Sequence, residues 1–111
     1  MTKHIEEFRL CIDEERFYDA HEVLEELWFP RRFENSNEVM YLKALINAAV
    51  SFELLKRGRA KQSKKVWMNY LKYRQLFFKT DSLYLNDLHK LARHLETLHI
   101  KTHYLKHKIY D

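Results

Sequence analysis

Residues 39–55 read VMYLKALINAAVSFELL, and this stretch decides the fold. If it is helical, apolar side chains fall on almost every side of the helix. A helix at a protein surface carries a single apolar stripe, whereas a helix that is apolar nearly all round is buried. The sequence therefore predicts a central helix over about residues 38–56, with the other elements packed around it.

The composition supports an all-α fold around this helix. The chain of 111 residues has one glycine and one proline, while 46% of its residues are hydrophobic. Sandwiches and barrels need many turn residues, which this chain lacks. We predict a single domain over 1–111, a compact array of about five helices, with its end, about 100–111, a candidate for fraying. The expected helices cover about residues 3–15, 18–28, 38–56 and 60–79, and a fifth begins after Asp81. In the fifth helix Leu88, Leu91, Leu95 and Leu98 follow a 3-4-3 spacing that suits packing against another helix.

Signals for the ends of these helices are uneven. Pro30 lies in the clear loop FPRRFENSN, and Asn35, Ser36 and Asn37 are N-cap candidates for the central helix. Gly58 suits the C-terminal end of that helix. Asp81 is a cap candidate for the fifth helix, whereas no glycine or proline marks the break between the first two.

Cysteine content and hydropathy indicate the compartment. Cys11 is the sole cysteine, so the chain forms no internal disulfide, and its spacing predicts a core position. The N-terminus has no apolar signal core, and no apolar run approaches the roughly 20 residues that span a bilayer. We expect a soluble cytoplasmic protein without a membrane partner.

The most informative motif for function is YDAHEVLEELW, residues 18–28. At 100° per residue, His21 and Glu25 form an i, i+4 pair at the border of the apolar face, with Trp28 alongside. Glu22 points away, and with Asp19 as N-cap it would complete a capping box. A histidine, a carboxylate and an indole in this pattern indicate either a buried polar cluster that orients helices or a metal or acid–base site.

A metal site needs a third ligand, and the central helix offers Glu53. This carboxylate lies in the middle of an apolar face, where it is costly unless it meets a cation, a protonated histidine or a metal. An antiparallel pairing of the two helices would bring His21 and Glu53 near one end. In this interpretation His21, Glu25 and Glu53 hold a divalent metal such as zinc, Trp28 shields it, and Glu22 or Glu25 is the catalytic general base.

The motif resembles a known family. The residues Tyr18, Ala20, His21, Glu22, Leu24, Glu25 and Trp28, followed by LKALINAAVSFELLKRG, are similar to the small bacterial and archaeal proteins grouped as domain of unknown function 309. The resemblance covers about residues 8–60 and implies a compact all-α domain, sometimes described as a metal-dependent hydrolase. The resemblance marks His21, Glu22, Glu25 and Trp28. We add Tyr18 and Asn47 as residues that would support the cluster, although relatives usually have GLIQ where this chain has Ala44-Leu45-Ile46-Asn47. Relatives often carry a second histidine where this chain has Glu53-Leu54.

The charge distribution supports a different function. Residues 1–53 hold 12 acidic and 6 basic side chains, whereas residues 54–111 hold 4 and 14. The two halves either complement each other, within the fold or between subunits, or the basic half faces an anionic partner. Lysines of the fourth helix would then track phosphates, with Trp67, Tyr70 and Tyr73 interleaved. The anion-binding candidates are Lys61, Lys64, Lys65 and Lys72.

Three functions thus remain open from the sequence. The first is a ligand- or metal-binding domain, with hydrolase activity as an extension. The second is a non-enzymatic helical interaction module, such as a homodimer, in which the cluster is purely structural. The third is a phosphate or RNA binder, the least favoured of the three because lysine faces are usually solvated surface. His99, His103 and His107 form an i, i+4, i+8 ladder, which we interpret as an adventitious metal binder.

Overall fold

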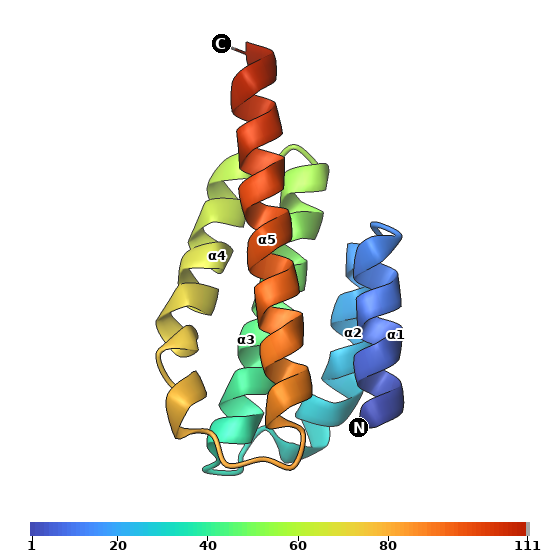
Figure 1. Ribbon diagram of the computed structural model, residues 1–111, viewed down its shortest axis with the longest axis vertical. Coiled ribbons are helices and arrows are strands. Elements are labelled where there is room, and N and C mark those ends of the chain that lie inside the picture. Colours follow the sequence, from blue (N-terminus) through green and yellow to red (C-terminus); the bar gives the residue numbers. More distant parts are fainter. Residues whose placement is uncertain (111) are drawn as a thin grey trace.

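The computed structural model describes the backbone of residues 1–110 and the side chains of residues 1–103. The described part is all-helical, with no strand, so the prediction of an all-α array of five helices is confirmed. Figure 1 shows the helices running roughly along the long axis of the molecule. They are α1 (Thr2–Asp13), α2 (Phe17–Trp28), α3 (Asn37–Lys56), α4 (Ala60–Arg74) and α5 (Leu85–Tyr110), with short 3-10 helices η1 (Phe29–Arg31) and η2 (Phe77–Lys79).

Helix α3 is the centre of the fold, as its uniform apolarity predicts. It packs against α2 and α4 and also contacts α5. Its buried side chains cover most of the helix circumference, and the remaining face, which carries Met40, Lys43, Asn47 and Val50, is half-buried. The helix starts after Ser36, one of the predicted N-cap residues. It ends before Gly58, whose φ of +78° allows Arg59 N–H to donate to the Leu54 carbonyl at 2.8 Å.

The connection between α1 and α2 is a tight turn that lacks glycine. Glu15 takes a φ of +58°, and Lys56 Nζ donates to its carbonyl oxygen at 3.0 Å. Arg16 N–H donates to the Cys11 carbonyl at 2.8 Å, which closes the turn. Because a non-glycine residue adopts the left-handed conformation here, the break has no glycine or proline signal. Cys11 is buried, as predicted.

Two predicted N-caps are wrong. Helix α2 begins at Phe17, so Asp19 lies in its first turn instead of capping it, and Asp19 pairs with Arg16 at 3.1 Å. The capping box with Glu22 therefore does not form. Helix α5 begins at Leu85, beyond Asp81, and the turn before it is held by Tyr84 N–H donating to Ser82 Oγ at 3.0 Å.

The fourth predicted helix, 60–79, is divided in two. Helix α4 ends at Arg74, and the chain continues through η2, where Phe77 is buried. The buried stripe of α4 is Ser63, Trp67 and Tyr70. Ser63 Oγ donates to the Ser51 carbonyl of α3 at 2.7 Å, and these small side chains allow the two helices to approach closely. The leucine spacing of α5 is confirmed, since Leu88, Leu91 and Leu95 are buried and Leu98 packs against the core.

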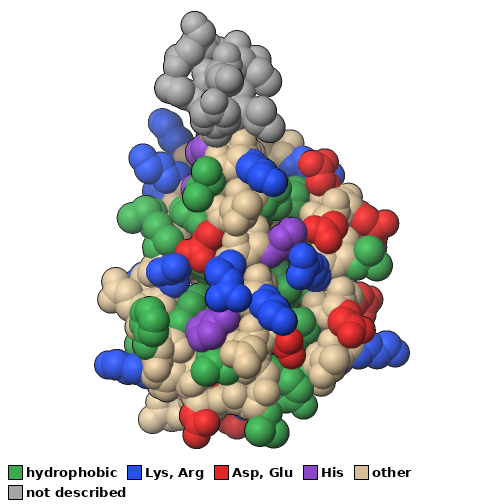
Figure 2. All heavy atoms as spheres, viewed as in Figure 1, with side chains coloured by type: hydrophobic (Ala, Val, Ile, Leu, Met, Phe, Trp, Pro, Cys, Tyr) green, Lys and Arg blue, Asp and Glu red, His purple; other side chains and the backbone are tan. Residues whose placement is uncertain are grey.

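In the described part of the chain, no helix is both long enough and apolar enough to cross a membrane. Charge is unevenly distributed over the face in Figure 2: Lys and Arg side chains gather over the middle of α5, and most Asp and Glu side chains lie on the side of α1 and α2. The imbalance between the two halves of the sequence is therefore an imbalance across the folded surface.

Candidate functional site

The residues of the motif lie on two parts of the surface of helix α2, a buried inner face and a partly exposed border. Its inner face, with Phe17, Ala20, Val23 and Leu24 buried, packs against α1 and α3. Its border carries His21, whose side chain is 24% exposed, and Glu25, which is 40% exposed. The i, i+4 pair predicted from the sequence forms as an ion-pair contact, with 2.5 Å between His21 Nε2 and Glu25 Oε2.

A pocket of about 250 Å³ opens beside His21, between α2 and α3. Its lining is largely apolar and comes from Phe17, Tyr18, His21, Val50, Glu53, Leu54 and Arg57. The expected meeting of His21 and Glu53 therefore occurs, because both line this pocket. Glu53 also finds the cation that its position requires: Arg57 Nε donates to Glu53 Oε1 at 2.8 Å.

A second, more open pocket lies on the other side of His21. It has a volume of about 490 Å³ and is lined by Tyr18, His21, Glu22, Glu25, Glu26 and Phe29. The Glu22 carboxylate raises the pKa of the Tyr18 hydroxyl, because a nearby negative charge and a hydrogen-bond acceptor both favour the protonated phenol. His21 thus lies between two pockets, one with an apolar floor and one with an acidic surface.

Trp28 lies apart from both sets of pocket-lining residues. The Lys43 ammonium lies 4.2 Å from the centroid of its indole ring, and the ring packs partly against the core. The predicted role of Trp28 in shielding a metal therefore has no geometric support. Asn47, the other supporting residue, is half-buried on α3.

The described residues contain no group of three or more His, Cys, Asp or Glu side chains arranged to hold a metal ion. His21 and Glu25 supply two neighbouring donors, but Glu53 is engaged by Arg57. Arg57 was not among the site residues predicted from the sequence. Its signal was present, because a glutamate four residues before an arginine on a helix is a favourable ion pair.

The histidine ladder that begins at His99, another candidate site, lies against the core. His99 stacks on Trp67, with ring centroids 3.8 Å apart and an interplanar angle of 4°, and it lies 4.0 Å from the ring of His103. Burial, with a smaller effect of His103, lowers the pKa of His99 to about 4. His107 lies outside the residues whose side chains are described.

Helix α4 exposes all four lysines proposed for anion binding, Lys61, Lys64, Lys65 and Lys72. The aromatic residues between them face inward: Trp67 and Tyr70 are buried, and Tyr73 is half-buried. Stacking of bases on this helix therefore has no exposed platform among those three rings, whereas phosphate binding by the lysines stays a prediction.

Comparison with known proteins supports the family resemblance. The family model described as Domain of unknown function (DUF309) matches residues 5–66, which contain most of α1, all of α2 and α3, and the first turns of α4. Neither a search of curated proteins nor a search of solved structures gave a match. Because the match spans more than half of the chain and includes the whole of the His21 site, the protein belongs to the DUF309 family.

Proposed function

We propose that this protein is a binding domain whose site is the groove around His21, and that the ligand is a small organic cation, such as an amine with an apolar body. The observation that carries the proposal is the pair of adjoining pockets at His21, one largely apolar and one acidic. Ligand sites typically combine an apolar cavity with a few polar groups that fix orientation.

The charges around the groove favour a cation. Glu22, Glu25, Glu26 and Glu53 surround it, and Arg57 is the one arginine or lysine among the lining residues of the two pockets. Partial burial of Glu53, whose side chain is 19% exposed, strengthens its interaction with a positive group that enters the pocket. An incoming ammonium would share the carboxylate with Arg57.

The floor of the smaller pocket favours an organic ligand over a hydrated inorganic ion. Phe17, Val50 and Leu54 offer apolar contact, and the ring of Tyr18 at the rim provides a face for a cation. At about 250 Å³ the cavity suits a ligand of one ring and a short side chain. An alkyl or aryl ammonium matches both the floor and the rim.

A metal-dependent hydrolase is the second candidate, supported by the convergence of His21 Nε2 and Glu25 Oε2. The donor set as folded does not fit a catalytic metal, which usually has three protein ligands, because Glu53 is bound to Arg57. We therefore derive no hydrolytic step, and Glu22 and Glu25 keep their proposed role as bases only if a metal is found.

The test is calorimetric titration with benzylamine and, separately, with zinc, in a background where His99, His103 and His107 are glutamine. We expect benzylamine to bind, and Glu53→Gln to weaken it by roughly fivefold, since a partly exposed ion pair contributes about 1 kcal/mol. Glu7→Gln, an exposed change on α1, is the matched control. Stoichiometric zinc binding that is lost in His21→Ala would support the metal site instead. Binding of neither would favour the interaction module, with the cluster as architecture.

A further inference from the structure

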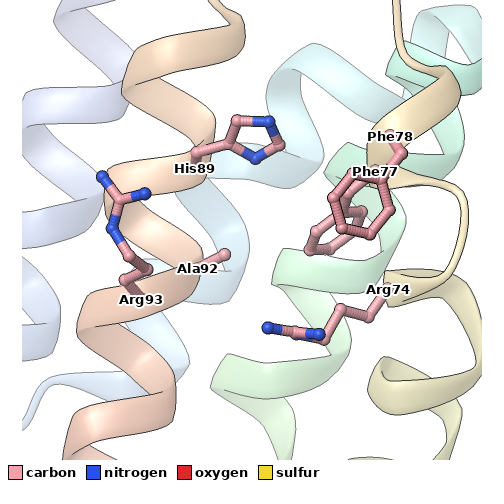
Figure 3. Close-up of a pocket in the computed structure, with 6 residues that line it drawn as sticks. All are labelled: Arg74, Phe77, Phe78, His89, Ala92 and Arg93. Atoms are coloured by element: carbon pink, nitrogen blue, oxygen red, sulfur yellow. The ribbon is translucent and has the colours of Figure 1, made fainter.

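A separate pocket lies between the end of α4 and the first half of α5, outside the segment that the family model matches. It has a volume of about 220 Å³ and is lined by Arg74, Phe77, Phe78, His89, Ala92 and Arg93. Figure 3 shows Arg74, Phe77 and Phe78 on one side of it and the three residues of α5 on the other. Donors and aromatic rings therefore face each other across a small gap.

Arg74 offers part of its guanidinium to this pocket. Its Nε forms an ion pair with Glu96 of α5, which fixes the orientation of the planar group. In Figure 3 the guanidinium extends across the gap toward α5. Because a guanidinium has five N–H donors, a pairing through Nε leaves the terminal nitrogens able to bind an anion.

Arg93 supplies a second positive charge on the opposite wall. It is exposed, and no acidic residue of the described part forms an ion pair with it. Its charge reaches the pocket, since burial and then Arg93 lower the pKa of His89. Lys90, also exposed on α5, adds to the positive potential of this face, where Figure 2 shows Lys and Arg side chains gathered.

His89 contributes a neutral donor. Its Nδ1 lies 2.7 Å from the hydroxyl oxygen of Tyr41, a side chain that is 1% exposed. Burial raises the pKa of Tyr41, so the phenol stays protonated. We assign its hydroxyl as the donor to Nδ1, because the hydroxyl hydrogen has no other acceptor among the described residues. Nδ1 is then unprotonated, and in the neutral ring Nε2 carries the hydrogen.

The aromatic wall of the pocket consists of one buried ring and one exposed ring. Phe77 is buried and stacks on Tyr41, with ring centroids 3.5 Å apart at 7°. Phe78, the next residue, is 90% exposed at the mouth of the pocket. A ring that enters between them and α5 would cover Phe78 while its substituent reaches the guanidinium groups.

We propose that this pocket binds a small aromatic anion, one ring that carries a carboxylate or a phosphate. The guanidinium of Arg74, which extends into the gap in Figure 3, would hold the anionic group. Arg93, whose exposed guanidinium lies in that view on the side of α5 away from Arg74, would turn toward the anion, His89 Nε2–H would orient it, and Phe78 would cover the ring. A cavity of about 220 Å³ is below the range of roughly 300–1,000 Å³ that is usual for drug-sized ligands, which favours a single ring. Both acids present two oxygens that can accept the bidentate hydrogen bonds of an arginine guanidinium.

The experiment titrates the full chain with phenyl phosphate and with benzoate, followed by calorimetry and by NMR of the His89 and Phe78 ring signals. Two partial probes accompany them: benzyl alcohol, which has the ring but no charge, and inorganic phosphate, which has the charge but no ring. We expect one-to-one binding of at least one aromatic anion, shifts at both rings, and weaker binding of the two partial probes. The better of phenyl phosphate and benzoate identifies the acid.

Arg93→Gln should weaken binding by roughly tenfold or more, as expected for loss of a hydrogen bond to a charged group. Arg93 is exposed and the Arg74–Glu96 pair is kept, so this variant should fold. Arg59→Gln, which removes an exposed arginine at the opposite end of α4, is the matched control and should leave binding unchanged. Equal weakening by both variants would reveal diffuse attraction to the basic half and overturn the proposal, as would the absence of binding or of shifts at His89. Glu53→Gln should not affect this site, so its outcome is independent of the groove at His21.

Discussion

Acidification should destabilise the fold through His99. This ring stacks on Trp67 and also lies 6.2 Å from the ring centroid of Phe52, between α3, α4 and α5. Burial makes the charged imidazolium unfavourable here, and the pKa of His99 falls from 6.5 to about 4. In the unfolded chain the same side chain takes up a proton at about pH 6.5.

The direction of the pH effect on stability follows from this difference in pKa between the folded and the unfolded state. Between pH 6.5 and pH 4 the unfolded state binds more protons than the folded state, so stability falls as the pH falls. The full shift corresponds to about 3 kcal/mol by linkage. His99 is partly exposed, and solvent screening reduces this figure, so we expect a loss of about 1–2 kcal/mol between pH 7 and pH 4.

Urea denaturation followed by circular dichroism at pH 7, 6, 5 and 4 measures this loss. Other groups also titrate in this range, so the informative quantity is the difference between the natural protein and His99→Phe, which keeps a ring against Trp67. His103→Gln is the control, and it should reduce the effect only slightly because burial is the larger cause of the shift. If the difference between the natural protein and His99→Phe stays constant from pH 7 to pH 4, the reasoning is refuted.

Two further predictions concern stability. Tyr41→Phe removes the hydrogen bond to His89 Nδ1 and leaves that nitrogen without its partner. The free energy of unfolding, measured by urea denaturation, should therefore fall by about 1 kcal/mol. Tyr18→Phe changes an exposed tyrosine and should have little effect. Gly58→Ala should lower the same quantity by about 1 kcal/mol, since a Cβ there meets no atom within 4 Å and only the φ of +78° is unfavourable. Gly58→Asn should lower the free energy of unfolding by less than Gly58→Ala does. If Gly58→Ala leaves this free energy unchanged, the turn tolerates an ordinary residue and the prediction is wrong.

Much of the fold could be predicted from the sequence because its strongest signal is hydrophobic. The uniform apolarity of 39–55 identified the central helix, and the leucine spacing of the fifth helix identified its buried face. Helix ends were less predictable, since they depend on local hydrogen bonds that have several possible partners. Asp81 was predicted as the cap of the fifth helix, but in the turn before α5 it is Ser82 Oγ that accepts a hydrogen bond, from Tyr84 N–H. The turn at Glu15 depends on a contact from Lys56, which is distant in the sequence.

The candidate site could be predicted only in part. The pair of His21 and Glu25 follows from helical spacing, and the approach of Glu53 follows from an antiparallel helix pairing. The role of Arg57 as the partner of Glu53 also follows from i, i+4 spacing, but the prediction did not take this pair into account. The pocket at Arg74 and Arg93 had no sequence signal, because its lining residues are brought together by the end of α4 at Arg74 and by the turn through η2. Neither feature was expected from the pattern of residues 60–79.

The segment that defines the family requires the rest of the chain to complete its core. Residues 5–66 include α3, whose buried side chains cover most of its circumference. One part of that surface is covered by Trp67 and Tyr70 of α4, and another by Leu88 and Leu95 of α5, all of which lie beyond the matched segment. Without them α3 would present a broad apolar surface to water, which single domains rarely do. The acidic groove at His21 is therefore positioned by a helix that the basic half holds in place, and a change in either half alters the support of the other.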